Sequence, residues 1–269
     1  MTRAAIISAF PGELKHLVLH WQHERHGSVD LWHWTHDAGT DEQGQWIAAC
    51  AGAGGEQATR AFAAAEQFAR SAQPVQSSQN LQLVPIGQSA LSSPIDLAVS
   101  TGWAGALHRV LEPGLVYSVA GVIDARTGEM IPTAELRQDI WLVTSPIVAL
   151  GPEKDRLAAT YNAGLVDMEA STIARLATMR NIPFYCVKGV SDGLYDNLPD
   201  LNRFLTPAGQ LDLARLTLFA LVRPWYWPSL IRMGENSRKA AGGIAEHVLE
   251  VLDPRGVIRN RNGYPDRKR

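Results

Sequence analysis

The sequence contains little cysteine and no long apolar run. Cys50 and Cys186 are the only two cysteines among 269 residues, and both lie in apolar stretches. We therefore expect reduced, buried thiols rather than a disulfide framework. No apolar run reaches the length of a membrane-spanning helix, and no charged segment followed by an apolar one opens the chain. These absences favour a cytoplasmic protein.

An excess of charge of one sign is also missing. The formal net charge is −2, which argues against a nucleic-acid partner. Histidines crowd the start of the chain: His16, His20, His23, His26, His33 and His36. His16 and His20 would share a helix face, as zinc ligands do, but no cysteine or acidic ligand pattern accompanies them. The residues at 23–26 are one residue short of the metalloprotease motif. We expect surface histidines and no metal.

Two catalytic motifs are absent as well. No serine nucleophile elbow occurs in the chain, which argues against that class of hydrolase. The glycines in residues 50–56 do not have the spacing of a dinucleotide-binding loop. We therefore expect no bound cofactor.

The residues that are present predict a mixed α/β sheet flanked by helices. A hydrophobic content of 46% with 19% charged residues suits a soluble domain, which we place at residues 1–252. Apolar runs predict strands at 4–10, 31–36, 46–51, 95–100, 115–123, 140–144 and 184–187. Helical periodicity predicts helices at 13–21, 56–70, 169–179, 211–222 and 243–252. Residues 71–93 read as a polar connection or insertion, 197–252 as a C-terminal helical part, and 253–269 as a disordered basic tail.

Two acidic pairs stand in order on either side of one predicted helix. Met168-Glu169 opens the helix, and Ser191-Asp192 follows the apolar strand after it. Ligands gather at the carboxyl ends of strands in open α/β sheets, so Asp192 is placed where an active-site acid would lie. Each carboxylate taken alone is better explained as a helix cap. The two pairs together favour catalysis.

These residues resemble the signature of the nucleoside phosphorylase and nucleosidase family. The match is specific at residues 166–193. Looser matches are the first strand with Glu13, the glycine loop at 50–55, and the Thr-Gly-x-Ala-Gly turn at 101–105. The resemblance implies a three-layer α/β fold, a homo-oligomer that is most simply a dimer, and cleavage of a purine from a ribose. The substrate would be a purine nucleoside, in particular an adenosine modified at its 5′ position.

The resemblance also implies roles for the residues that match it. Asp192 would protonate N7 of the leaving purine, with a pKa raised by burial and with Ser191 orienting it. Ionised Glu169 would accept hydrogen bonds from the ribose hydroxyls, and Met168 would pack against the sugar. Glu13 would help to activate water, although a glutamate at a helix start explains it equally well. The substrate-binding candidates are Met168, Glu169, Gly102, Trp103, Ile147 and Val148.

The nucleophile is open at this point. A site for water or phosphate is expected at Gly52, Gly54, Gly55 and Arg60, because a glycine loop before a helix offers N–H groups to an anion. Residues 100–106 lack the arginine that phosphate-using relatives often have, and Trp103 stands where the nucleosidases have a small serine. We favour hydrolysis and keep phosphate as a possible co-substrate.

An aromatic segment at 223–233 is the last notable feature. Trp225, Tyr226 and Trp227 lie between Arg223 and Arg232. Such a segment suits packing on the sheet or a subunit interface, and it also suits a peripheral membrane contact or a lip for a lipidic 5′ group. The segment resembles the hopanoid-associated branch of the family, which implies adenosine joined to a polycyclic lipid. A non-catalytic nucleoside-binding or interaction protein on the same fold is the alternative function.

Overall fold

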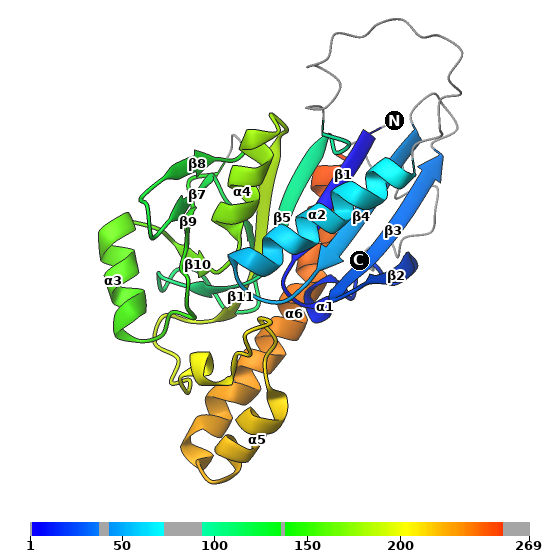
Figure 1. Ribbon diagram of the computed structural model, residues 1–269. Helices are drawn as coiled ribbons and strands as arrows, with labels where there is room; N and C mark the ends of the chain where they lie inside the picture. The colour runs from blue at the N-terminus through cyan, green and yellow to red at the C-terminus, as the bar shows by residue number, and fades with distance from the viewer. Residues whose placement is uncertain (1, 38–42, 73–92, 136–137, 255–269) are drawn as a thin grey trace, which may run out of the picture.

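The computed structural model describes residues 2–37, 43–72, 93–135 and 138–254 (Figure 1). The strands are β1 (Thr2–Ser8), β2 (Gln22–His26), β3 (Val29–Asp37), β4 (Gln43–Cys50), β5 (Leu97–Ala106), β6 (Val116–Ser118), β7 (Gly121–Asp124), β8 (Met130–Pro132), β9 (Trp141–Thr144), β10 (Leu165–Asp167) and β11 (Phe184–Asp192). The helices are α1 (Pro11–Leu14), α2 (Gly55–Ser71), α3 (Pro152–Tyr161), α4 (Ala170–Met179), α5 (Leu213–Leu221) and α6 (Trp227–Leu252), with 3₁₀ turns η1 (Leu201–Phe204) and η2 (Pro224–Tyr226).

All the described strands form one mixed sheet that branches at β5. The main path runs β2-β3-β4-β1-β5-β10-β9-β7-β8, and β11 pairs with both β5 and β6. The first half of β5 runs parallel to β1, its end pairs antiparallel with β10, and β11 runs parallel to it along most of its length. Gly102 lies between the two halves with φ +127°, a backbone angle that side chains other than glycine's rarely allow. The bend lets one strand serve both parts of the sheet.

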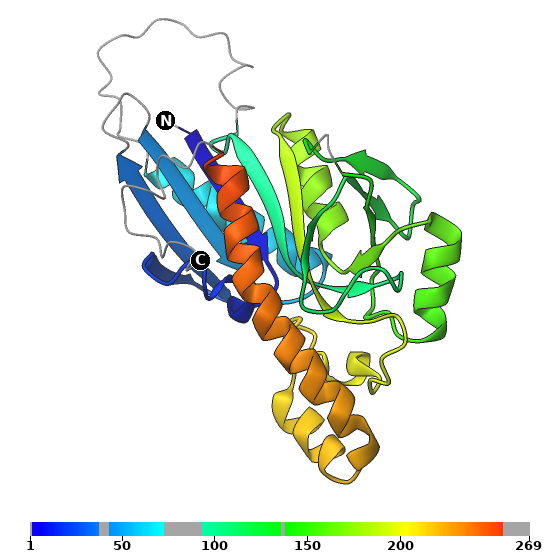
Figure 2. The same cartoon turned by 180° about the vertical axis from the view of Figure 1, so that it is seen from behind.

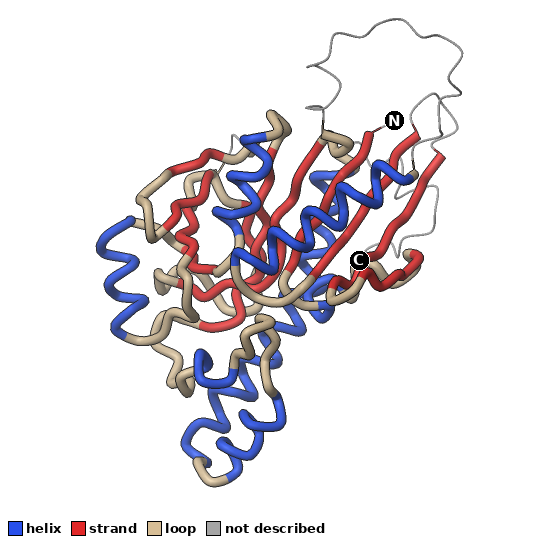
Figure 3. Tube along the Cα trace, in the orientation of Figure 1, coloured by secondary structure: helices blue, strands red, loops and turns tan. Residues whose placement is uncertain are grey.

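Helices cover both faces of the sheet, and β1 shows why (Figure 3). Ala5 and Ile7 face the core under α2 and α4, while Ala4 and Ile6 face the core under α1 and α6. Successive side chains of a strand point to opposite faces, so an apolar strand buried on both sides needs a helix layer on each. The predicted mixed α/β fold with flanking helices is confirmed.

Several elements differ from the sequence predictions. The helix expected at 13–21 is regular only over α1, although the predicted apolar residues Leu14, Leu17, Val18 and Trp21 are all buried. Residues after Leu14 continue in tight turns instead, with Leu17 and Val18 both donating to the Leu14 carbonyl. The burial that the pattern predicts is therefore achieved without a regular helix.

The glycine-containing turn expected at 101–105 is part of strand β5. Strand β11 extends to Asp192, and α6 begins at Trp227 rather than near residue 243. Strands β2, β8 and β10 and helix α3 were not predicted, and the strand expected at 115–123 is divided into β6 and β7. The connection at 71–93 and the tail at 253–269 fall almost wholly outside the described residues.

Candidate active site

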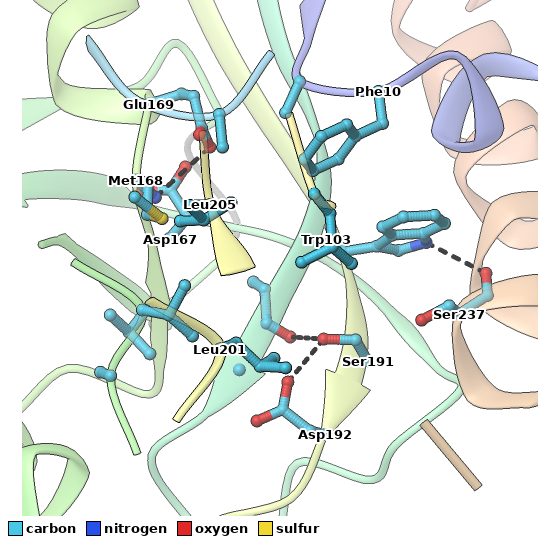
Figure 4. Close-up of a pocket in the computed structure, with 18 of the residues that line it drawn as sticks. Phe10, Trp103, Asp167, Met168, Glu169, Ser191, Asp192, Leu201, Leu205 and Ser237 are labelled. Carbon is cyan, nitrogen blue, oxygen red and sulfur yellow. Dashed lines mark hydrogen bonds between the residues drawn. The ribbon is translucent and has the colours of Figure 1, made fainter. Parts of the chain in front are cut away.

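A cavity of about 200 Å³ opens at the carboxyl ends of β1, β5, β10 and β11 (Figure 4). Its lining is mostly apolar, and its polar side chains include those of the two acidic pairs, with Glu13, Asp167 and Ser237 beside them. The lining residues named in the sequence analysis are Glu13, Trp103, Ile147, Val148, Met168, Glu169, Ser191 and Asp192. Segments distant in sequence therefore meet here, as expected for strand ends that share one edge of a sheet.

Asp192 ends β11 at a break in the strand register. The pairing of β11 with β5 shifts between Val190 and Asp192, so both Ser191 and Asp192 line the cavity. The Ser191 hydroxyl donates to Asp192 Oδ1 over 2.6 Å and lies 3.3 Å from the carbonyl oxygen of Ala104. Ser191 therefore fixes the orientation of the carboxyl group, as the sequence analysis expected of it.

Lys154 is a partner of Asp192 that the sequence analysis missed. Its ammonium, at the start of α3, donates to Asp192 Oδ2 over 2.5 Å and to the Gly193 carbonyl over 2.7 Å. The lysine is 1% exposed. Asp192 is thus held in an ion pair with a buried lysine and is not an isolated carboxyl group in an apolar wall.

Glu169 lies just before α4, at the start of which the sequence analysis placed it. Gly54 N–H donates to its Oε1 over 2.7 Å, and Met168 N–H donates to Oε2 over 3.3 Å. Burial, with Asp167 beside it, raises the pKa of Glu169 to about 8. An ionised carboxylate was expected from the sequence, whereas burial beside Asp167 favours a proton on Glu169 at neutral pH.

Asp167 and Lys188 form a buried ion pair next to Glu169. Lys188 Nζ lies 2.8 Å from Asp167 Oδ2, and both side chains are fully buried. Burial opposes the charge on Lys188, but Asp167 overcomes it and raises the pKa of the lysine. Asp167 also accepts from Thr144 Oγ1 over 2.8 Å and from Ala170 N–H over 2.9 Å. This ion pair holds in place the segment that carries Met168 and Glu169.

Glu13 links the loop after β1 to the bend of β5. Its Oε2 accepts hydrogen bonds from the Ser8 hydroxyl and from Ala9 and Phe10 N–H, and its Oε1 accepts from Trp103 N–H over 2.7 Å. Burial raises its pKa, opposed by these hydrogen bonds. Most acceptor positions of the carboxyl group are thus occupied by the protein. Its expected role in activating water stays a prediction.

Trp103 lines the cavity and does not face away from it. Its indole N–H donates to the Ser237 carbonyl of α6 over 3.0 Å, and its ring lies 6.3 Å from that of Phe10 (Figure 4).

Asn202 holds the loop of Ile147 and Val148, which also lines the cavity. Its side chain accepts from Val148 N–H over 2.8 Å and donates to the Val148 carbonyl over 3.0 Å.

The glycine loop does not form the expected free anion site. Gly52 N–H donates to the Ala9 carbonyl, Ala53 N–H to the Gly209 carbonyl, and Gly54 N–H to Glu169. Three successive donors are therefore used within the protein, and the carboxyl group at the start of α2 is that of Glu169 itself. Arg60 pairs with Glu56 on the half-exposed side of α2 and does not line the cavity.

Comparisons with known proteins agree with this geometry. Residues 140–223, which include both acidic pairs, match the family model of the phosphorylase superfamily. Three solved structures share the fold over 94% of this chain. They are futalosine hydrolase of Helicobacter pylori (11% identity, 98% of that chain, TM-score 0.62), S-adenosylhomocysteine nucleosidase of Streptococcus pyogenes (15%, 97%, 0.62), and methylthioadenosine/S-adenosylhomocysteine nucleosidase of H. pylori (12%, 99%, 0.61). The search of curated proteins found no match.

The family resemblance expected from the sequence is confirmed. The fold is that of the nucleoside phosphorylases and nucleosidases, and the matched segment carries the residues on which the resemblance was based. The nucleosidase of S. pyogenes was solved with 5-methylthiotubericidin, and that of H. pylori with butyl-thio-DADMe-Immucillin-A.

One wall of the cavity combines Met233, from the 223–233 segment considered above as a lip, with three leucines that were not predicted. It is apolar and comes from the C-terminal part of the chain: Leu201, Leu205, Leu211 and Met233. Nothing in the spacing of these residues marks them as site residues, because they lie on separate turns and helices. Within the described ranges, no cluster of histidine, cysteine or acidic residues is arranged to hold a metal ion. No helix in the same ranges is long and apolar enough to cross a membrane.

Proposed function

We propose that this protein cleaves the N-glycosidic bond of a purine nucleoside and releases the free base. The observation that carries the proposal is the placement of two carboxyl groups on different walls of one apolar cavity. Asp192 comes from the end of β11 with Ser191, and Glu169 comes from the start of α4 with Met168 (Figure 4). Breaking this bond leaves negative charge on the base and positive charge on the sugar, so the two ends of the substrate need different partners.

Asp192 would act at the base. A proton on its carboxyl group would pass to N7 of the purine as the bond to the ribose breaks. Because Lys154 contacts Oδ2 and Ser191 contacts Oδ1, both oxygens are oriented before the substrate binds. The lysine ammonium is a proton source in direct contact with that carboxylate.

Glu169 would act at the ribose. A carboxylate accepts hydrogen bonds from the two hydroxyls of the sugar, and Met168 offers a polarisable apolar surface beneath the ring. The negative charge of Glu169 would also favour the positive charge that develops on the ribose. A 2′-deoxynucleoside, which lacks one hydroxyl, should therefore be a poor substrate.

The attacking group is proposed to be water. The residues that line the cavity include no arginine or lysine in the described part of the chain, and the N–H groups of Gly52, Ala53 and Gly54 are already used. A phosphate dianion would enter such a site without a partner, which is costly. Glu13 is the lining carboxyl group that could orient the water.

The substrate is proposed to be an adenosine with an apolar 5′ substituent. The wall of Leu201, Leu205, Leu211 and Met233 has no polar group for the base or the hydroxyls, so it suits an alkyl group. The relatives solved with methylthio and butyl-thio ligands support this class. A hopanoid-linked adenosine, suggested by the sequence of the 223–233 segment, is the largest member of the class.

The test is an adenine-release assay on adenosine, methylthioadenosine and a long-chain 5′-alkylthioadenosine, each with and without phosphate. We expect adenine with free sugar, no acceleration by phosphate, and better turnover as the 5′ group becomes more apolar. A sugar 1-phosphate product would instead show phosphorolysis. Absence of adenine from every substrate would overturn the proposal.

A second candidate function is nucleoside binding without turnover. The Lys154–Asp192 ion pair favours it, because the candidate acid is already bound to a cation of the protein. Calorimetric binding of methylthioadenosine, without adenine release under any pH, would support this candidate.

A further inference from the structure

Helix α5, η2 and the start of α6 form a hairpin that projects from the body of the molecule (Figure 2). We call residues 213–232 the tip. Its two helices are held together from within, since Trp227 donates its indole N–H to the Ala220 carbonyl over 2.7 Å and Phe219 packs near Tyr226. The tip therefore does not pack on the sheet, which was one of the alternatives left open by the sequence.

The outward side chains of the tip are apolar. Among the described residues, half of the large hydrophobic side chains that are exposed lie in this short segment: Leu213, Leu218, Leu221, Val222, Trp225, Trp227 and Ile231. Leu218 is 67% exposed, Trp225 60% and Ile231 59%. A concentration of exposed apolar surface on a soluble fold marks an interaction site.

The charges of the tip have one sign. Arg215, Arg223 and Arg232 are its only charged residues, and no aspartate, glutamate or lysine occurs from 213 to 234. Arg223 lies over the ring of Phe219 at 3.9 Å, and Arg232 is 3.8 Å from Asp196 of the body. Apolar side chains framed by arginines suit the boundary of an anionic bilayer, where the apolar groups are buried and the guanidinium groups stay at the headgroups. Two copies of the tip facing each other would bring like charges together.

The tip is also continuous with the cavity. An apolar groove between α5 and α6 is lined by tip residues together with Leu211 and Met233, and these two residues also line the active-site cavity. A surface on which the tip rests would therefore lie at the end of an apolar path that starts beside the candidate catalytic groups.

We propose that the tip docks the protein on anionic lipid bilayers as a peripheral, non-spanning contact. Tip side chains enter the headgroup boundary, and the arginines select anionic lipid. Docking does not depend on the proposed reaction, and its test contains no nucleoside. It deepens the proposed function by placing the apolar wall of the cavity next to a source of lipidic substrates.

The experiment is co-sedimentation of the full-length protein with vesicles of phosphatidylcholine alone and with vesicles that contain phosphatidylglycerol. We expect binding that is at least about tenfold tighter with the anionic lipid and that weakens as salt is added. The combined variant Leu218→Ser, Trp225→Ser, Ile231→Ser should lose binding to both vesicles. Arg215→Gln should weaken only the preference for anionic lipid.

The matched control replaces exposed apolar residues elsewhere: Leu19→Ser, Val110→Ser and Met179→Ser, which are 66%, 80% and 76% exposed in the parent protein. The control should bind vesicles as the parent protein does. Absence of parent binding to anionic vesicles, or equal losses in the two triple variants, would overturn the proposal. So would a parent dimer, measured by sedimentation equilibrium, that the tip variant alone converts to a monomer while vesicle binding is unchanged. That result would show that the tip is the contact between two copies of the chain.

Discussion

At the scale of single residues, the candidate site depends on how each buried carboxyl group is compensated. Asp192 is paired with an ammonium, Glu13 is surrounded by N–H donors, and Glu169 is left beside another carboxylate. The carboxyl groups of the cavity therefore have different surroundings. These surroundings, rather than the type of residue, distinguish one carboxyl group from another.

Replacing the proposed acid should stop the reaction without unfolding the protein. In Asp192→Asn the amide still accepts from Ser191, but it cannot give a proton to N7. We expect kcat to fall about 10²–10⁴-fold. The measurement is adenine release, with circular dichroism to check the fold. Turnover near that of the parent protein would show that Asp192 is not the acid.

Replacing Lys154 should show how much the unpaired carboxylate of Asp192 lowers the free energy of unfolding. In Lys154→Met, Asp192 loses its ammonium, and an uncompensated buried charge costs about 3 kcal/mol. In the double variant Lys154→Met/Asp192→Asn no carboxylate is left unpaired, so much of the lost stability should return. Urea unfolding of the parent protein and of both variants measures this. A loss that persists unchanged in the double variant would show that only packing was removed.

Binding of a riboside should release a proton from Glu169. The empty site raises the pKa of this residue to about 8, so it is mostly protonated at neutral pH. Ribose hydroxyls that donate to the carboxylate lower this pKa, and the proton leaves. Calorimetry near neutral pH in buffers of different ionisation enthalpy should show up to one proton released. Glu169→Gln should release none, and proton uptake by the parent protein would contradict the assignment.

At the scale of elements, the bend of β5 brings the two halves of the site together. Gly102 lets one strand pair with β1 and then turn to meet β10, while β11 pairs with it on both sides of the bend. A side chain at this position would meet the Glu13 carboxylate at 2.7 Å. Glu13 can therefore accept from Trp103 N–H at this position only because residue 102 has no side chain.

Gly102→Ala should destabilise the fold more than a glycine substitution of similar backbone strain. The new methyl group displaces Glu13, in addition to the strain of φ +127°. Gly128→Ala is the matched control, because Gly128 has φ +72° and open space around it. We expect a loss of about 3 kcal/mol for Gly102 and about 1 kcal/mol for Gly128. Equal losses in urea unfolding would show that backbone strain alone matters.

At the scale of the whole molecule, the sheet and the projecting hairpin supply different kinds of side chain. The strand ends hold the polar groups, while η1, α5 and α6 supply the apolar wall of the cavity and the apolar path leading away from it. Figures 1 and 2 show the hairpin extending away from the sheet and its helices. A substrate with a long apolar group would contact both parts.

Vesicles should therefore favour long-chain substrates. With anionic vesicles present, turnover of a long-chain 5′-alkylthioadenosine should rise several-fold in the parent protein, because docking brings the site to the surface that holds the substrate. Turnover of methylthioadenosine, which stays in water, should not change. The variant Leu218→Ser, Trp225→Ser, Ile231→Ser should lose the vesicle effect and keep its activity on methylthioadenosine, because these residues do not line the cavity. Equal vesicle effects on both substrates would show that docking does not act by bringing the long-chain substrate to the site.

The sequence by itself determined the mixed α/β class, most strands and helices, and the two acidic pairs. These follow from periodicity and from residues that are neighbours in the chain, such as Met168 with Glu169 and Ser191 with Asp192. Only the tertiary structure decided the partners of those residues. Lys154 reaches Asp192 from α3, Gly54 reaches Glu169, and Asp167 meets Lys188, each across a distance in sequence that no local pattern encodes.

The same limit applies to the glycine loop and to the aromatic segment. Local sequence predicted free N–H donors at 52–55, but whether they are free depends on Ala9, Gly209 and Glu169, which folding brings to them. The composition of residues 223–233 was compatible with a core, an interface or a membrane surface. Exposure excludes packing in the core, and exposure is a property of where the hairpin stands relative to the sheet. Propensity and periodicity are local, whereas ion pairs and burial depend on which distant segments fold together.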